Sequence, residues 1–125
     1  GHYFVDRKNH RAALAVMEQV AMQMSANKDN SLVIFAEGTR SEDGQLQRFK
    51  KGAFILSLDT GIPIVPVIIN GAHKAMGKKQ RRISATTITL TILPPMDPGA
   101  YSAEKRDQYL DDATALFVKH YKPPQ

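Results

Sequence analysis

The most constraining feature of this 125-residue sequence is a short apolar run that ends abruptly in polar residues. Residues 32–36 are all apolar, and they are followed directly by Glu37, Gly38, Thr39 and Arg40. An unbroken apolar run of this length predicts a strand buried on both faces, as in a parallel sheet. Ligands of open α/β sheets bind just beyond the carboxyl ends of such strands. These four residues are therefore candidate binding residues, and an ordinary polar turn without a ligand is the alternative interpretation.

Length and charge limit the classes of protein to consider. A chain of 125 residues forms one domain at most, and no apolar stretch is long enough to span a membrane. The absence of cysteine excludes disulfides and thiolate metal sites. Seventeen Lys and Arg against twelve Asp and Glu give a formal net charge of +5, which favours anionic partners such as phosphates or an acidic membrane surface.

The region before this run predicts a strand and a helix. Residues 3–5 read as the end of a strand, so the chain looks incomplete at its N-terminus. Asn9 is a plausible helix N-cap, and the polar residues 27–30 end the helix. Its inward face is predicted from apolar residues at three- and four-residue steps: Leu14, Met17, Val20, Ala21 and Met24. Together with residues 32–36, these elements predict a right-handed βαβ unit.

A second helix is predicted over residues 48–61, with Gly61 as its C-terminal stop. Its start carries three cations, Arg48, Lys50 and Lys51. The helix dipole disfavours cations at this end unless they share an anion with the free backbone N–H groups. We therefore expect an anion there, the alternative being that the three side chains simply point into water.

Two further strands and a last helix complete the prediction. Residues 62–70 form an apolar strand, whose start is irregular because Pro63 and Pro66 cannot donate ladder hydrogen bonds. Residues 87–92 alternate as in a half-buried strand near a sheet edge. The last helix starts near Ser102 and ends before Pro123. The fold class predicted is α/β, a mainly parallel sheet of about four strands with helices on both faces.

A phosphate site follows from the placement of two arginines. Arg7 and Arg40 end strands that flank one crossover helix, so both guanidinium groups can reach the same crevice. A catalytic base is missing from the pattern. None of the four histidines, at positions 2, 10, 73 and 120, is followed five residues later by an acid, and no metal-ligand cluster is visible. The chain thus shows a binding site more clearly than a reaction.

Three segments in series resemble the glycerolipid acyltransferases. Residues 1–7 are similar to the family's second block, Gly-x-x-Phe-Ile-Asp-Arg, and residues 35–41 to the third, Phe-x-Glu-Gly-Thr-Arg-Ser. Residues 49–52 resemble the basic segment after the third block, and residues 64–67 with Gly71 resemble the fourth. The likeness covers about residues 1–71 and is nearest to bacterial 1-acylglycerol-3-phosphate acyltransferases. It implies an α/β fold like that of glycerol-3-phosphate acyltransferase.

The resemblance also implies an activity and the residues that serve it. These enzymes transfer a fatty acyl group from acyl-CoA or acyl carrier protein, as co-substrate, to lysophosphatidic acid, without a cofactor or metal. Arg7 and Arg40 would hold the acceptor phosphate. Glu37, Gly38 and Thr39 would shape the same loop, Lys50 and Lys51 would add positive charge, and Pro66 would line the acyl or acceptor pocket.

One block of the family is absent. The His-x-x-x-x-Asp pair, in which the His acts as general base, precedes the second block in the family and is expected upstream of this chain. The resemblance then implies that residues 1–125 are the C-terminal portion of a single acyltransferase domain. Such a portion is inactive alone, and its parent would act at the cytoplasmic face of the membrane, peripherally or anchored by an N-terminal segment.

Two other functions remain open. The first is a non-catalytic module that binds phosphate or lipid head groups. Five cations between Lys74 and Arg82 could contact an anionic membrane surface peripherally. The second, a nucleic-acid-binding domain, ranks low because those cations lack interleaved aromatic residues and no helix-turn-helix pattern is present, so no nucleic-acid partner is expected.

Overall fold

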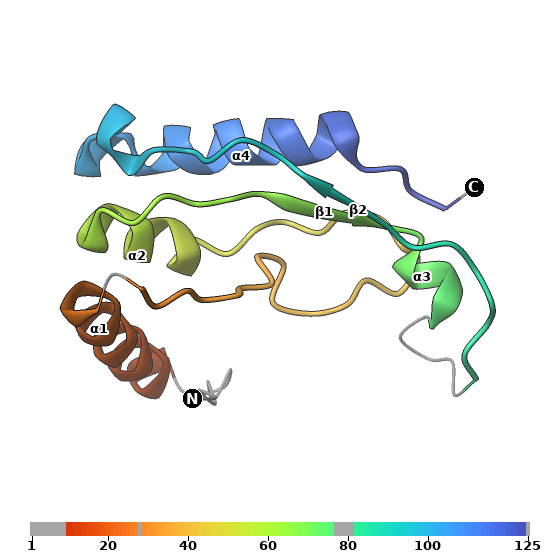
Figure 1. Cartoon of the computed structure of the whole chain (residues 1–125), viewed down its shortest axis with the longest axis horizontal. Helices are drawn as coiled ribbons and strands as arrows, with labels where there is room; N and C mark the ends of the chain where they lie inside the picture. Colours follow the sequence, from red (N-terminus) through yellow and green to blue (C-terminus); the bar gives the residue numbers. More distant parts are fainter. Residues whose placement is uncertain (1–9, 28, 77–81, 125) are drawn as a thin grey trace.

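The computed structural model describes residues 10–27, 29–76 and 82–124, and it stacks the elements in layers. In Figure 1, α4 runs along one side, α1 lies at the other, and α2 and the two strands lie between them. No helix within these ranges is both long and apolar enough to cross a membrane. In chain order the elements are α1 (His10–Ala26), α2 (Gly52–Thr60), β1 (Val67–Asn70), α3 (Ala72–Ala75), β2 (Thr89–Ile92), the 3₁₀ turns η1 (Pro98–Ala100) and η2 (Ala103–Lys105), and α4 (Arg106–His120).

The first helix agrees with its sequence pattern. α1 ends at Ala26, where the predicted polar turn begins, and the Asn27 side chain accepts a hydrogen bond from the Asp29 N–H at 3.0 Å. Val20 and Met24 are buried and pack against Leu56 of α2. The spacing rule therefore found the inward face of this helix. Its expected cap Asn9 lies outside the described residues.

The second helix is shorter than predicted at its start. α2 begins at Gly52, four residues later than expected, and it ends at Thr60 with Gly61 as its C-cap, the stop that was predicted. Phe54 of this helix is buried, and its ring meets Tyr109 of α4 edge to face at a centroid distance of 5.4 Å. Phe49, Leu110 and Ala113 complete the buried core between α2 and α4.

Two buried hydroxyls tie this core to the chain that enters and leaves the sheet. Tyr109 is fully buried, and its O–H donates to the Met96 carbonyl at 3.0 Å. The Ser57 hydroxyl donates to the Ile62 carbonyl and lies 3.0 Å from the Tyr109 oxygen. Because buried polar groups are costly without partners, these contacts fix how α2, α4 and the segments around residues 62 and 96 meet.

The sheet of the described residues has two antiparallel strands. Val67 pairs with Ile92 and Asn70 with Thr89, at the two ends of the register. Residues 62–66 form no regular ladder, as the two prolines predicted: they join the chain beside them through an isolated bridge between Ile64 and Met96 and a hydrogen bond from the Leu93 N–H to the Pro66 carbonyl. The predicted parallel arrangement is therefore not found among these strands. Residues 3–5, the expected first strand, lie outside the described residues.

Only one face of β1 is closed. Ile68 is 1% exposed, and Asn70, on the same face, donates from its side chain to the His120 carbonyl at the end of α4. The opposite face presents Val67 and Ile69 with their cross-strand partners Ile92 and Leu90, all exposed. The prediction of helices on both faces is wrong for the described residues, because nothing within them covers this second face.

The prediction for residues 32–36 was also wrong. This segment has no ladder partner in the described chain, and Val33 and Phe35 are 84% and 74% exposed. An apolar run shows that a segment suits two-sided burial, but the neighbouring strands and helices must supply that burial. The expected βαβ unit is consequently absent from the described part of the chain.

Candidate functional site

The polar residues after position 36 form a tight turn. Gly38 has a φ of +72°, the left-handed region that side chains with a Cβ rarely adopt. Its N–H donates to the Phe35 carbonyl at 2.9 Å, which closes the turn. Gly38 thus serves the turn that the sequence predicted, and Thr39 and Arg40 lie exposed immediately after it.

The turn opens a loop that folds back on its own base. The Gln47 N–H donates to the Glu37 carboxylate at 2.7 Å, and the Lys50 N–H donates to the Ala36 carbonyl at 2.8 Å. Glu37 therefore uses one carboxylate oxygen to hold the loop over residues 37–47 closed. This contact suits a residue that shapes the loop, whereas a carboxylate facing a phosphate would repel it.

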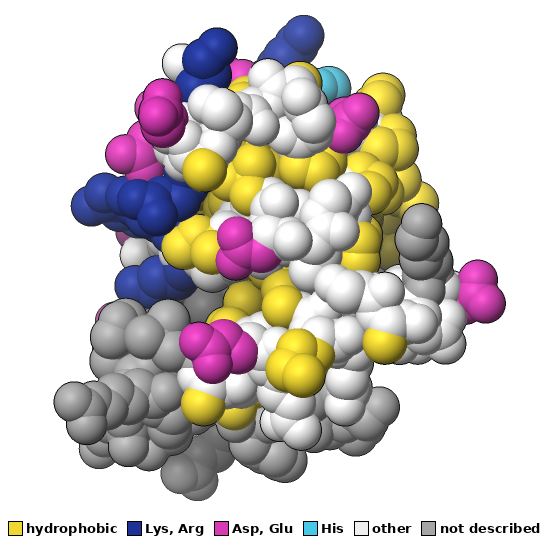
Figure 2. Space-filling view, turned by 90° about the vertical axis from the view of Figure 1, so that its left-hand side faces the viewer, with side chains coloured by type: hydrophobic (Ala, Val, Ile, Leu, Met, Phe, Trp, Pro, Cys, Tyr) yellow, Lys and Arg dark blue, Asp and Glu magenta, His cyan; other side chains and the backbone are white. Residues whose placement is uncertain are grey.

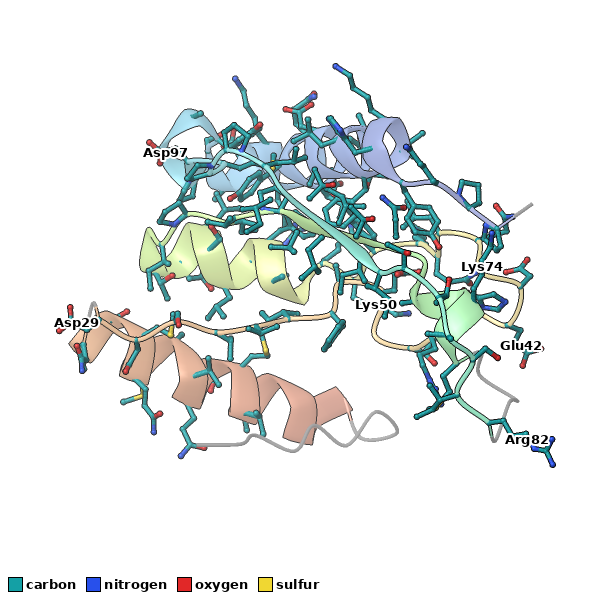
Figure 3. The ribbon with its side chains drawn as sticks, turned by 45° about the vertical axis from the view of Figure 1, so that its right-hand side comes forward. Asp29, Glu42, Lys50, Lys74, Arg82 and Asp97 are labelled. Atoms are coloured by element: carbon teal, nitrogen blue, oxygen red, sulfur yellow. The ribbon has the colours of Figure 1, made fainter. Side chains whose placement is uncertain are left out.

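Loop closure brings one of the predicted lysines to the turn. The Lys50 side chain passes Gly38, with its Cγ 3.6 Å from where a Cβ on that glycine would stand. In Figure 3, Lys50 lies between the end of the molecule that carries Lys74 and the opposite end with Asp29 and Asp97. Lys50 and the exposed Arg40 are thus the cations that the described structure places on this loop and at its base.

Lysine 51 points elsewhere. Its Nζ forms an ion pair with Asp107 in the first turn of α4, at 2.8 Å. The hydrogen bond from Lys51 lowers the pKa of the Asp107 carboxyl, and the charge of Arg48 lowers it further. The cations before α2 are thus partly balanced by a carboxylate of the protein, and Lys51 is directed away from the turn at Gly38.

An apolar cavity of about 590 Å³ begins beside this loop. Residues 31–37 and residues 62–69 both line it, together with side chains of α2 and α4. Its lining is dominated by aliphatic and aromatic side chains, and it includes Glu37 from the loop and Pro66 from the segment before β1. A cationic loop next to an apolar cavity suits an amphiphile with an anionic head and a hydrocarbon tail.

Figure 2 views the molecule from the end opposite α3. Apolar side chains reach this surface between α4 and the lower layers, and charged side chains surround them. The interior is therefore partly open at this end as well as along β1.

The structure leaves the prediction for Arg7 untested and adds a cavity that the sequence did not indicate. Arg7 lies outside the described residues, so its convergence with Arg40 stays a prediction. No cluster of metal-ligating side chains occurs within the described ranges. His73 and Lys122 were not among the candidate site residues, yet both line a second cavity near the C-terminus. No spacing rule links positions 49 residues apart, so only the fold could reveal that cavity.

Known proteins match this chain over most of its length. It is 37% identical over 124 residues to a 1-acyl-sn-glycerol-3-phosphate acyltransferase of Limnanthes douglasii, covering 99% of this chain and 44% of that protein. It is 36% identical over 96 residues to the human 1-acyl-sn-glycerol-3-phosphate acyltransferase alpha, covering 77% of this chain and 34% of that protein. The chain thus spans less than half the length of these relatives.

A solved structure agrees with these sequences. The 1-acyl-sn-glycerophosphate acyltransferase PlsC of Thermotoga maritima superposes with a TM-score of 0.72 at 26% identity, covering 86% of this chain and 44% of that one. A sequence model of the family described as Acyltransferase matches residues 1–70, which include the turn at Gly38 and the start of the sheet. The chain therefore belongs to the acyltransferase family.

Proposed function

We propose that this chain is the acceptor-binding part of an enzyme that transfers a fatty acyl group to lysophosphatidic acid in phospholipid biosynthesis. The observation that carries the proposal is the turn at Gly38, with the Lys50 side chain against it and Arg40 exposed just after it, directly following Glu37, which lines the apolar cavity. Lysophosphatidic acid has the matching chemistry, a phosphate at one end and a hydrocarbon chain at the other. The relatives named above support the same acceptor.

Arg40 is the residue we assign to the acceptor phosphate. Its planar guanidinium group donates two parallel hydrogen bonds to a phosphate, which the single ammonium of a lysine cannot do. Arg7, in the segment that resembles the family's second block, is its proposed partner. Lys50 adds positive charge. Lys51 is paired with Asp107, so it acts on the phosphate only through long-range electrostatic attraction and not through a direct contact.

The transfer step itself needs a base that this chain does not contain. No histidine here has an acid five residues later. We propose that residues 1–125 do not turn over alone, and that a His-x-x-x-x-Asp pair elsewhere in the parent protein removes the acceptor's hydroxyl proton. The acyl donor is a thioester of coenzyme A or of acyl carrier protein. The parent would work at the cytoplasmic face of the membrane, where its acceptor resides.

The test is the affinity of the full chain for a short-chain lysophosphatidate, measured by calorimetry below its micellar concentration. Arg40→Lys should weaken binding about tenfold, since a charge-assisted hydrogen bond contributes about 1.5–3 kcal/mol. Arg106→Lys is the matched control, because Arg106 is exposed in the first turn of α4 and does not line the apolar cavity. Equal affinities of the wild-type and Arg40→Lys proteins would exclude Arg40 as the phosphate ligand.

An activity assay separates this proposal from a binding module. Acyl transfer by purified residues 1–125 would contradict the assignment of the base to another part of the parent. A parent coding sequence without any His-x-x-x-x-Asp pair would instead favour a non-catalytic module that binds phosphate or lipid head groups.

A further inference from the structure

A second, polar cavity of about 300 Å³ lies at the end of the molecule with α3 and the C-terminal tail. Three segments far apart in sequence form it: the end of β1 with α3, residues 86–87 before β2, and residues 121–124. Its polar lining side chains include those of Asn70, His73, Lys74, Thr86, Tyr121 and Lys122.

The tail that forms one wall is fixed in place by hydrogen bonds. The Asn70 side chain donates to the His120 carbonyl at 3.2 Å and accepts from the Lys122 N–H at 2.7 Å. The Tyr121 hydroxyl donates to the Gly44 carbonyl, on the loop that begins at the Gly38 turn. The cavity is thus a built feature of the fold and adjoins the loop that carries Arg40.

Close packing at Gly44 reinforces this wall. A Cβ on Gly44 would clash with the Pro124 ring and would stand 2.9 Å from the His73 Cγ. The loop, α3 and the tail therefore meet with no room for a larger residue at this position. The two cavities adjoin at Tyr121, which lines both, and the loop that contributes Glu37 to the first accepts the Tyr121 hydrogen bond at Gly44.

The charge of the second cavity is positive. His73, Lys74 and Lys122 line it, and none of its described lining residues is acidic. Two carboxylates act on the Tyr121 wall: burial raises the pKa of Tyr121, and the charges of Glu37 and Asp43 raise it further. Glu37 and Asp43 each accept a backbone N–H of their own loop, from Gln47 and Gln45 respectively. Figure 3 shows Lys74 and Glu42 at this end of the molecule.

We propose that this cavity binds a phosphate group at the nucleotide end of coenzyme A, the carrier of the acyl donor. The inference rests on the proposed function and adds the donor site to it. A polar concavity lined by two lysines and a histidine suits a phosphate and not a hydrocarbon chain. Both cavities are lined by Tyr121, so the pantetheine arm of a coenzyme A held here by its nucleotide end can extend from this cavity toward the acceptor cavity.

The test is direct binding of the full chain to coenzyme A, to dephospho-coenzyme A and to pantetheine, followed by calorimetry or by chemical shifts of the His73 ring. Affinity should fall in that order as phosphates are removed. The double variant Lys74→Ala/Lys122→Ala should bind coenzyme A about tenfold more weakly, a size set by two partly exposed charge contacts. Alanine at 122 keeps the N–H that holds Asn70, and unchanged thermal unfolding verifies the fold.

The matched control is Lys105→Ala/Arg106→Ala, which removes two exposed positive charges at the start of α4. It should leave the affinity for coenzyme A unchanged. An equal loss in both double variants would overturn the site in favour of general charge attraction. Pantetheine binding as tightly as coenzyme A would also overturn it.

Two further binding measurements distinguish coenzyme A from free phosphate and from lipid head groups as the ligand of this cavity. Inorganic phosphate that binds as tightly as coenzyme A would contradict the nucleotide assignment. Phosphatidylglycerol vesicles that bind through Lys74 and Lys122, with no binding of coenzyme A, would assign the cavity to lipid head groups instead. Lysophosphatidate binding through Arg40 with no coenzyme A binding would refute this inference alone, because the proposed function would stand.

Discussion

The helical core and the strand region of this molecule both contain large apolar side chains, yet the two regions differ in how far those side chains are buried. Between α2 and α4, Phe54 is 3% exposed and Tyr109 is fully buried. On the open face of the sheet, Leu90 and Ile92 are 62% and 71% exposed, and Val33 nearby in the cavity-lining segment is 84% exposed. Apolar sequence alone therefore does not tell which surface is buried.

The difference lies in where the covering groups come from. The helices of the core are covered by neighbouring elements of the same described chain, so the side chains that helical spacing predicts to face inward are the ones that are buried. The apolar strand face needs a second layer, and within the described ranges none is present. Such a face is available for whatever buries it, whether polypeptide or hydrocarbon.

Phe54→Ala should have the largest effect on stability. Removing a buried ring from the α2–α4 core leaves a cavity and should lower the free energy of unfolding by about 3–5 kcal/mol. Urea unfolding followed by circular dichroism measures this loss. A loss below about 1 kcal/mol would show that the core is not closed as described.

Tyr109→Phe should cost less but still clearly destabilise the protein. The change keeps the ring stacked on Tyr101 and removes the hydroxyl that donates to the Met96 carbonyl. The Met96 carbonyl keeps the hydrogen bond from the Ile64 N–H, so the loss of the one from Tyr109 should cost about 0.5–1.5 kcal/mol. Tyr101→Phe is the control, because its hydroxyl bonds Asp112 closer to solvent and its loss should cost less. A larger loss of stability in Tyr101→Phe than in Tyr109→Phe would contradict the account, because the hydroxyl of Tyr101 would then contribute more to stability than that of Tyr109.

Alkaline pH should weaken the packing at Tyr101 over a defined range. The hydrogen bond to the Asp112 carboxylate, with burial and the charge of Asp112, raises the pKa of Tyr101 from 10.0 to about 12. A raised pKa means that the folded state favours the protonated phenol. This contribution to stability is complete below pH 10 and is lost as the pH rises toward 12.

Ultraviolet titration of the phenols measures this pKa. Asp112→Asn should return the Tyr101 titration toward the ordinary tyrosine value, and Tyr101→Phe should remove it from the curve. A Tyr101 that titrates at its ordinary value in the wild-type protein would show that the hydrogen bond to Asp112 is not formed in solution.

Val33→Thr should have the smallest effect. The side chain lies in the extended segment that lines the first cavity and is 84% exposed, so the change should alter the free energy of unfolding by no more than about 0.5 kcal/mol. A loss near that of Phe54→Ala in the same urea series would mean that residues 32–36 are covered in solution.

Local signals carried the sequence predictions that succeeded. The polar turn after Ala26, the stop at Gly61 and the irregular strand start at Pro63 and Pro66 each follow from the chemistry of one or two residues. The turn at Gly38 was predicted in the same way, from the need for a positive φ.

Predictions that needed distant partners succeeded less well. The strand at residues 32–36 and the parallel sheet depend on neighbours that no local pattern supplies. Lys51 was assigned to an anion, but its partner Asp107 lies 56 residues away. Tyr109 escaped notice because its burial depends on Ser57 and Met96, which meet its hydroxyl only in the fold. The second cavity depends in the same way on Lys122 reaching Asn70.

The most direct test of the proposed acceptor site is the dependence of lipid binding on the phosphate. Calorimetry would compare the wild-type chain with a lysophosphatidate and with a monoacylglycerol of the same acyl length. We predict that the lysophosphatidate binds at least about tenfold more tightly, and that this advantage shrinks as salt screens the exposed Arg40. Equal affinity for the two lipids at low salt would contradict a phosphate site at the Gly38 turn.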